Sequence, residues 1–157
     1  MLDAISKELI LQKDYLNGAD IETIYFGGGT PSVLTINDLD ILFKTINNNF
    51  NLKENLEITL EANPDDLNSD YLSDLKKYTP VNRLSIGIQS FSEDDLLWMN
   101  RAHNAIEARA CIEYAQDAGF DTRTSLNGIV RTIHPEQIIF WKRLDADAQT
   151  IDGCIFF

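Results

Sequence analysis

The chain has 157 residues, 44% of them hydrophobic, a length and composition typical of one domain with a single core. Its 25 acidic residues against 13 basic ones give a net charge of −12, which disfavours nucleic acid and anionic membranes as partners. The N-terminus shows neither a signal peptide's apolar core nor a transmembrane segment, and Cys111 and Cys154 form no metal-ligand pattern with either histidine. These features predict a reducing, cytoplasmic setting and no metal site within the chain.

The first helix is predicted over residues 2–17, where apolar residues recur at helical spacing up to Gly18, a residue type favoured just past a helix end. A β-branched and aromatic run at residues 21–26 predicts a strand that stops at three consecutive glycines. Thr35 and Asp38 have the spacing of a capping box and predict the start of the next helix. The buried stripe of that helix is predicted to contain Leu39, Leu42, Phe43, Ile46 and Phe50.

A second strand is predicted at residues 56–61, where apolar and polar side chains alternate. It breaks at Pro64 and leads into a helix around residues 69–78, which Pro80 prevents from continuing. Residues 83–89 alternate in the same way and predict a third strand.

Two further helices are predicted after the third strand. Ser92 can cap a short one whose first turn is acidic, and Asn104 can cap a longer one that stops at Gly119. Cys111 falls on the apolar face of the longer helix and is interpreted as a small core residue.

The alternation of β and α segments predicts a parallel α/β sheet with right-handed crossovers. A doubly wound sheet and a barrel both satisfy this order. The predicted strands carry one apolar face and one face of polar or small residues, which favours an incomplete (β/α) barrel around a polar ligand.

Candidate site residues follow successive strands, at the edge where parallel α/β folds bind their ligands. The glycines at 27–29 allow the backbone to approach a ligand closely, and Thr30 adds a hydroxyl group; a tight turn without a ligand is the alternative. A nucleotide phosphate is disfavoured because the next helix begins only near Thr35. Glu61 and Gln89 end the next two strands and suit a neutral-to-cationic polar ligand.

Arg101 and His103 lie beyond the third strand. The guanidinium of Arg101 can clamp a carboxylate through two hydrogen bonds, and a surface ion pair is the alternative. His103 has no base or nucleophile near it in the sequence pattern, so no role is assigned to it.

Four segments closely resemble the radical S-adenosylmethionine (SAM) family that contains oxygen-independent coproporphyrinogen III oxidase. They read IYFGGGTPS (24–32), TLEANP (59–64), LSIGIQSF (84–91) and NRAH (100–103), in that order. The first two look more like the HemW-type heme chaperones than like the oxidase. The resemblance covers about residues 3–120 and implies part of a radical SAM (β/α) barrel.

The resemblance also implies a SAM site. Its residues would be Gly28, Gly29, Thr30, Glu61, Gln89 and Arg101. The glycines and Thr30 would hold the methionine end, Glu61 and Gln89 the polar groups, and Arg101 the carboxylate. Full-length relatives are expected to bind a [4Fe-4S] cluster, SAM and heme, and to pass heme to acceptor proteins.

Two departures from the family pattern matter. The family's Cys-x-x-x-Cys-x-x-Cys cluster motif would fall upstream of Met1, so the cluster ligands are absent here and the chain alone is expected to bind SAM weakly and to be inactive. Beyond residue 120 the sequence no longer matches, and Leu126 stands where an aspartate is expected. We therefore expect a partial barrel at 1–120 and a divergent segment at 121–157, with a possible helix at 135–144.

Three functions follow from these observations. The leading hypothesis is a fragment of a radical SAM heme chaperone, and the second is a fragment of a true coproporphyrinogen III dehydrogenase of porphyrin biosynthesis. The third is a non-catalytic half barrel that binds another small metabolite. In each case the strand at 21–26 would lack its preceding neighbour, so self-association through the exposed barrel edge is expected.

Overall fold

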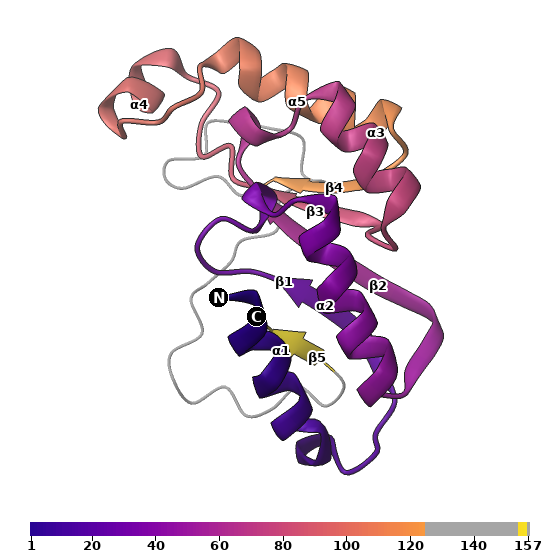
Figure 1. Cartoon of the computed structure of the whole chain (residues 1–157). Coiled ribbons are helices and arrows are strands. Elements are labelled where there is room, and N and C mark those ends of the chain that lie inside the picture. Colours follow the sequence, from indigo (N-terminus) through magenta and orange to yellow (C-terminus); the bar gives the residue numbers. More distant parts are fainter. Residues whose placement is uncertain (125–153, 157) are drawn as a thin grey trace.

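The computed structural model describes residues 1–124 and 154–156. Within these ranges all strands belong to one parallel sheet with the order β4-β3-β2-β1-β5 (Figure 1). The strands are β1 (Ile21–Phe26), β2 (Leu52–Ala62), β3 (Arg83–Ile86), β4 (Asp121–Thr124) and β5 (Cys154–Phe156). The predicted parallel α/β sheet is therefore confirmed.

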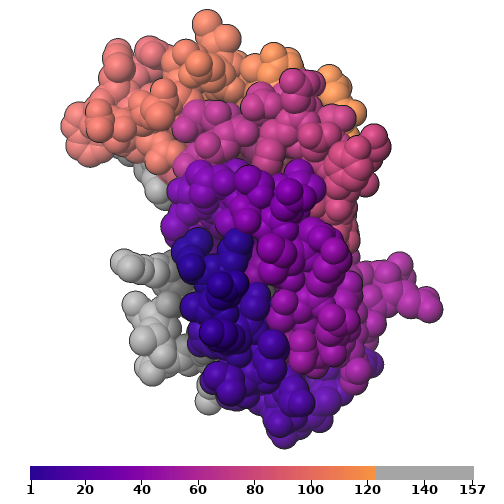
Figure 2. All heavy atoms as spheres, viewed as in Figure 1, coloured from indigo at the N-terminus to yellow at the C-terminus, as the bar shows by residue number. Residues whose placement is uncertain are grey.

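The helices are α1 (Leu2–Leu11), α2 (Ile36–Asn49), α3 (Ser69–Tyr78), α4 (Glu93–Trp98) and α5 (Ala105–Asp117). Short 3-10 turns add η1 (Lys13–Leu16), η2 (Pro31–Val33) and η3 (Pro64–Asp66). Figure 1 shows α1, α2, α3 and α5 on one side of the sheet. The space-filling view of that side shows the N-terminal segment and α2 next to each other, and α1 contacts α2 (Figure 2).

The helix starts follow from their predicted caps. The Thr35 hydroxyl accepts a 3.2 Å hydrogen bond from the Asp38 amide, and the Asp38 carboxylate accepts a 3.0 Å bond from the Thr35 amide. Asn104 forms the same reciprocal pair with Glu107, at 2.9 Å in both directions. These capping boxes satisfy amides that have no partner within a helix. At the other end of α5, Gly119 has φ +80°, as predicted for a residue that ends a helix.

The core fills the space between the sheet and these helices. Phe26 and Phe43 meet edge to face with 5.2 Å between ring centroids, which joins β1 to α2. The predicted α2 stripe is buried except at Phe50, which is partly buried. Cys111 is buried as predicted, and burial raises the pKa of its thiol to about 11. Its thiol is thus a core group and not a reactive thiolate.

Two predicted boundaries differ from the structure. The first helix ends at Leu11, and residues 13–16 continue as a 3-10 turn before Asn17 adopts φ +50°. Leu11 is 80% exposed, so the core does not hold this turn in α-helical geometry. The third strand ends at Ile86 and not at Gln89, because its pairing with β2 stops at Ile86 and the Ile88 amide bonds back to the Ile86 carbonyl. Gln89 itself has φ +68°.

The edge of β1 also differs from expectation. Residues 23–25 pair in parallel with β5, so the prediction that this edge lies unpaired is wrong for these residues. At the other edge, β4 extends the sheet beyond the predicted boundary at residue 120. Leu126 and the helix predicted at 135–144 lie outside the described residues. No helix in the described ranges has both the length and the apolar character needed to cross a bilayer.

Candidate functional site

The ends of β1, β2 and β3 meet at one edge of the sheet and form a pocket of about 250 Å³, which we call the rim pocket. Strand register brings them together, because Phe26 pairs with Leu60 and Ala62 pairs with Ile86. The pocket is lined by Gly29, Thr30, Pro31, Glu61, Ala62, Asn63, Ser85, Gly87 and Gln89. The structure thus brings four of the six predicted site residues into one pocket.

Glu61 connects the glycine turn to the strand before it. Its Oε1 accepts a 2.5 Å hydrogen bond from the Tyr25 hydroxyl, and its Oε2 accepts a 3.1 Å bond from the Gly28 amide. Burial, with a further contribution from Glu61, raises the pKa of Tyr25 to about 12, so this hydroxyl stays a donor at physiological pH. The carboxylate is therefore fixed in place with its charge at the pocket wall.

The glycine turn needs its glycines for two different reasons. Gly28 and Gly29 have φ of +81° and +61°, a left-handed conformation that strains residues with a side chain. At Gly27 the constraint is space, because an added Cβ would lie 2.6 Å from Tyr25 Cε1 and 3.3 Å from Glu61 Cδ. Gly28, the fifth predicted residue, does not line the pocket but donates its amide to Glu61.

Gln89 also lines the pocket, and its backbone is in the left-handed region at φ +68°. Its Nε2 lies 3.2 Å from the point where a Cβ on Gly87 would stand, so a side chain at Gly87 would require the Gln89 amide to shift by a few tenths of an ångström. Its Oε1 is buried and, within the part of the chain that the structure describes, accepts no hydrogen bond. A buried acceptor without a protein partner is open to a donor from a ligand or from a water molecule.

Arg101, the sixth predicted residue, lies behind the pocket wall. Its Nη2 donates to Asn63 Oδ1 at 3.1 Å and to the Gly87 carbonyl at 3.2 Å. The alternative of a surface ion pair finds no support among the described residues, since both acceptors are uncharged. Arg101 thus holds two lining residues in place, and its buried Nε has no hydrogen-bond partner among the described residues.

Sequence reasoning missed several residues of the site. Ser85 and Gly87 line the pocket because they share a face of β3 and its extension, and the period-2 alternation that placed Glu61 would also have placed them. Asn63 follows β2 directly and contacts both the pocket and Arg101. His103 is buried, with its Nε2 3.0 Å from the Ile88 carbonyl, which no local pattern predicts.

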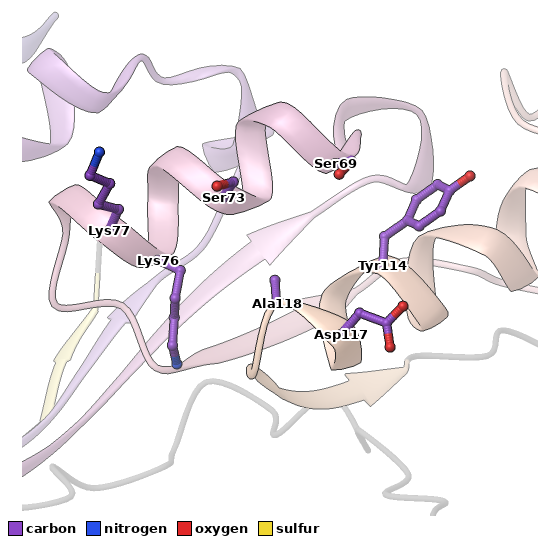
Figure 3. A pocket seen from close by; sticks show the side chains of 7 residues that line it. All are labelled: Ser69, Ser73, Lys76, Lys77, Tyr114, Asp117 and Ala118. Carbon is purple, nitrogen blue, oxygen red and sulfur yellow. The ribbon is translucent and has the colours of Figure 1, made fainter.

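A second hollow, of about 350 Å³, lies on the helical side between α3 and α5 (Figure 3). Lys76 is one of its lining residues, but its ammonium already donates to the Gly119 carbonyl at 2.7 Å and lies 4.7 Å from the Phe120 ring centroid. Lys77 also lines the hollow, and its ammonium lies 4.7 Å from the Tyr78 ring centroid. The described residues contain no group of three or more side chains arranged to hold a metal ion.

Comparison with known proteins identifies similar chains. The model of the Radical SAM superfamily matches residues 4–139. The mitochondrial radical S-adenosyl methionine domain-containing protein 1 of Dictyostelium discoideum is 39% identical over 131 residues, which cover 74% of this chain and 29% of that protein. The heme chaperone HemW of Haemophilus influenzae is 35% identical over 121 residues, covering 76% of this chain and 31% of that protein.

A solved structure shares the fold. The coproporphyrinogen III oxidase HemN of Escherichia coli, described as a radical SAM enzyme, superposes with a TM-score of 0.70 at 29% identity. The match covers 80% of this chain and 29% of that chain. The chain therefore spans less than a third of the length of each of these relatives.

Proposed function

The chain belongs to the Radical SAM superfamily, and from this premise we propose that its rim pocket binds SAM as part of a HemW-type heme chaperone. The predicted family resemblance and the predicted incomplete barrel are confirmed by the family match and by the HemN structure. Beyond this family membership, we propose a ligand, a substrate and partners for the chain.

The observation that carries the proposal is that the fixed carboxylate of Glu61 and the unpaired acceptor of Gln89 belong to residues lining the same pocket. SAM carries an ammonium group, a positively charged sulfur and ribose hydroxyls, and all of these favour a pocket with a carboxylate and hydrogen-bond acceptors. The backbone of Gly29 and Thr30 opens onto the same pocket. The chemistry of the lining therefore fits SAM.

We assign the predicted contacts accordingly. Gly29 and Thr30 hold the methionine end of SAM, and Gly28 supports this turn by donating its amide to Glu61. Glu61 and Gln89 accept hydrogen bonds from the ammonium and hydroxyl groups of SAM. Arg101 is the candidate for the carboxylate, through guanidinium donors other than the Nη2 bonds to Asn63 and Gly87.

The [4Fe-4S] cluster of the family does not fit the residues present. In that family the cluster supplies the electron that opens SAM. The sequence has two cysteines, and Cys111 is buried in the core with its thiol 3.3 Å from the Ala108 carbonyl. Three thiolate ligands are not present among these residues, so the proposal is limited to SAM binding and includes no step through the cluster.

Heme is the proposed cargo because the relatives include proteins named heme chaperone HemW, at 34–38% identity. Coproporphyrinogen III oxidases match at 29–32%, which places that reaction second. A half barrel for another small metabolite is the third candidate. We propose a cytoplasmic location from the HemW relatives, although one relative is named as mitochondrial.

Calorimetric titration with SAM tests the proposal. Glu61→Gln keeps the size of the side chain but removes its charge, and it replaces one of the two acceptor oxygens, which bind the Tyr25 hydroxyl and the Gly28 amide, with an NH2 donor. Loss of a charge-assisted bond predicts about ten- to hundred-fold weaker binding. The control is Glu57→Gln, which lies on the same strand, pairs with Arg83 and does not line the pocket, and which should bind SAM like the wild type.

The proposal fails if the wild-type chain gives no heat with SAM, or if Glu61→Gln binds it as tightly as Glu57→Gln does. Heat with a different polar metabolite would favour the third candidate. To separate the first two, heme is titrated into the chain and followed by its visible absorption. A heme chaperone predicts saturable binding of heme, whereas an oxidase predicts preference for the porphyrinogen substrate.

A further inference from the structure

His103 lies in the loop between α4 and α5, and its side chain is completely buried. Its Nε2 is 3.0 Å from the carbonyl oxygen of Ile88, within hydrogen-bond distance. Because a carbonyl oxygen only accepts, this contact assigns the ring proton to Nε2. The imidazole is thus a donor aimed at the backbone immediately before Gln89.

The backbone before Gln89 is held at two successive carbonyls by the same loop. Arg101 Nη2 donates to the Gly87 carbonyl at 3.2 Å, and His103 donates to the next carbonyl, that of Ile88. The Ile88 oxygen also accepts a 2.9 Å hydrogen bond from the Ser90 amide, so this one atom links the residues directly before and after Gln89. These bonds surround a glutamine at φ +68°, a conformation that side-chain-bearing residues avoid unless neighbouring contacts impose it.

The second ring nitrogen of His103, Nδ1, indicates that this side chain does more than occupy space in the core. Nδ1 of His103 is buried and has no hydrogen bond among the described residues; the Asp65 carboxylate oxygen is 3.8 Å away. An aliphatic side chain of similar size would fill this space without leaving a buried polar atom unpaired. The ring is therefore explained by its Nε2–H and not by its volume.

We infer that His103 is a positioning residue whose Nε2–H holds the Ile88 carbonyl and thereby sets Gln89 in the left-handed conformation that turns its side chain to the rim pocket. The inference rests on the proposed function only for the identity of the ligand. The link from His103 to Gln89 stands on the geometry of the described residues.

The test compares His103→Leu, which removes the donor at similar volume, with His103→Gln, whose side-chain amide can still donate to Ile88. Each is measured for SAM affinity by calorimetry in the wild-type and in the Gln89→Ala background. We expect His103→Leu to weaken SAM binding about ten-fold, and His103→Gln to recover to within about three-fold of wild type. In the Gln89→Ala background His103→Leu should change affinity by less than about two-fold.

An equal loss in both backgrounds would overturn the inference, because it would show a general effect on the fold and not one transmitted through Gln89. Two readouts need no ligand. Nitrogen-detected NMR of the wild-type ring should place the proton on Nε2. The Ser90 amide should exchange faster in His103→Leu than in the wild type, while the amide of Leu60 in the adjacent strand should exchange at the same rate in both.

A proton on Nδ1, or unchanged Ser90 protection, contradicts the positioning role whether or not SAM binds. If the wild type binds no SAM while both ligand-free readouts match, the proposed function fails and the role of His103 stands. Should His103→Leu not fold, the wild-type NMR spectrum and the exchange behaviour of His103→Gln decide.

Discussion

Replacing Gly27 with alanine should pull apart the pair formed by Tyr25 and Glu61. The added Cβ would lie 2.6 Å and 3.0 Å from Tyr25 Cε1 and Cδ1, and 3.3 Å from Glu61 Cδ. The two side chains are joined by a 2.5 Å hydrogen bond, so neither can move away without stretching it. The alanine therefore acts on the site through volume, since no left-handed φ is recorded at this glycine.

The expected size of the effect follows from the contact distances. Overfilling a packed site typically costs about 1–3 kcal/mol. Because the Tyr25 ring is only half-buried and can swing outward, we expect the lower part of that range, about 1–2 kcal/mol. For a chain of this size that corresponds to a fall in Tm of roughly 3–6 °C.

Gly18→Ala is the matched control, because Gly18 has φ +78° and an alanine Cβ there meets nothing within 4 Å. Its cost is left-handed strain alone, about 1–2 kcal/mol. The two variants should thus lose similar stability and differ only at the site.

Alkaline spectrophotometric titration distinguishes them. Gly27→Ala displaces the Tyr25 ring outward, which reduces its burial and breaks its bond to Glu61. Both changes should move the pKa of Tyr25 from about 12 toward the ordinary 10.0, whereas Gly18→Ala should leave it unchanged. Subtracting the titration curve of Tyr25→Phe from that of the wild type, and that of a variant lacking Tyr25 from each glycine variant, isolates this tyrosine among the five in the chain. If the pKa of Tyr25 in Gly27→Ala equals its wild-type value, the steric reasoning is refuted.

Three further predictions concern stability. The pKa of Tyr25 is raised from 10.0 to about 12, so its contribution to stability is complete below pH 10 and lost as the pH rises to 12. Urea midpoints at pH 9 and 11.5 should lie closer together in Tyr25→Phe than in the wild type, the remaining gap coming from Tyr71 and Cys111, whose pKa values are also raised; an unchanged gap would count against this. Asn104→Ala removes a capping box and should cost about 1 kcal/mol in urea unfolding, with Asn104→Asp close to wild type; equal losses in both would argue against the cap. Leu84→Ala, at a fully buried position of β3, should cost about 2–5 kcal/mol. Leu97→Ala, at a 70% exposed position, should stay within about 0.5 kcal/mol, and similar losses in the two leucine variants would contradict the assigned core.

Much of the fold was accessible from the sequence because it depends on neighbours along the chain. The caps at Thr35 and Asn104 need only residues three positions away. The meeting of Gly29, Glu61 and Gln89 follows from one rule, that parallel strands end at the same edge.

The details that determine chemistry depend on contacts between distant residues. The bond from Tyr25 to Glu61 requires the register of β1 against β2, which alternation alone does not fix. The position of Arg101 behind the pocket and the burial of His103 depend on how one loop folds back onto the end of β3. The pairing of β5 with β1 joins segments about 130 residues apart, as the paired residues Thr23 and Cys154 show, and no local pattern reports it.

The order of β1 to β4 across the sheet repeats their order along the chain. Each strand, with the helix that follows it, contributes its own residues to the rim pocket. The hydrogen bonds that join these residues span 33 positions from Gly28 to Glu61 and 14 from Gly87 to Arg101. Such short spans carry a low entropic cost of closure, so each new strand can add to a neighbour that has already formed. A binding surface built this way couples neighbouring units: a substitution in one unit also shifts what the next unit presents to the ligand, as the bonds from Gly28 to Glu61 and from Arg101 to Asn63 require.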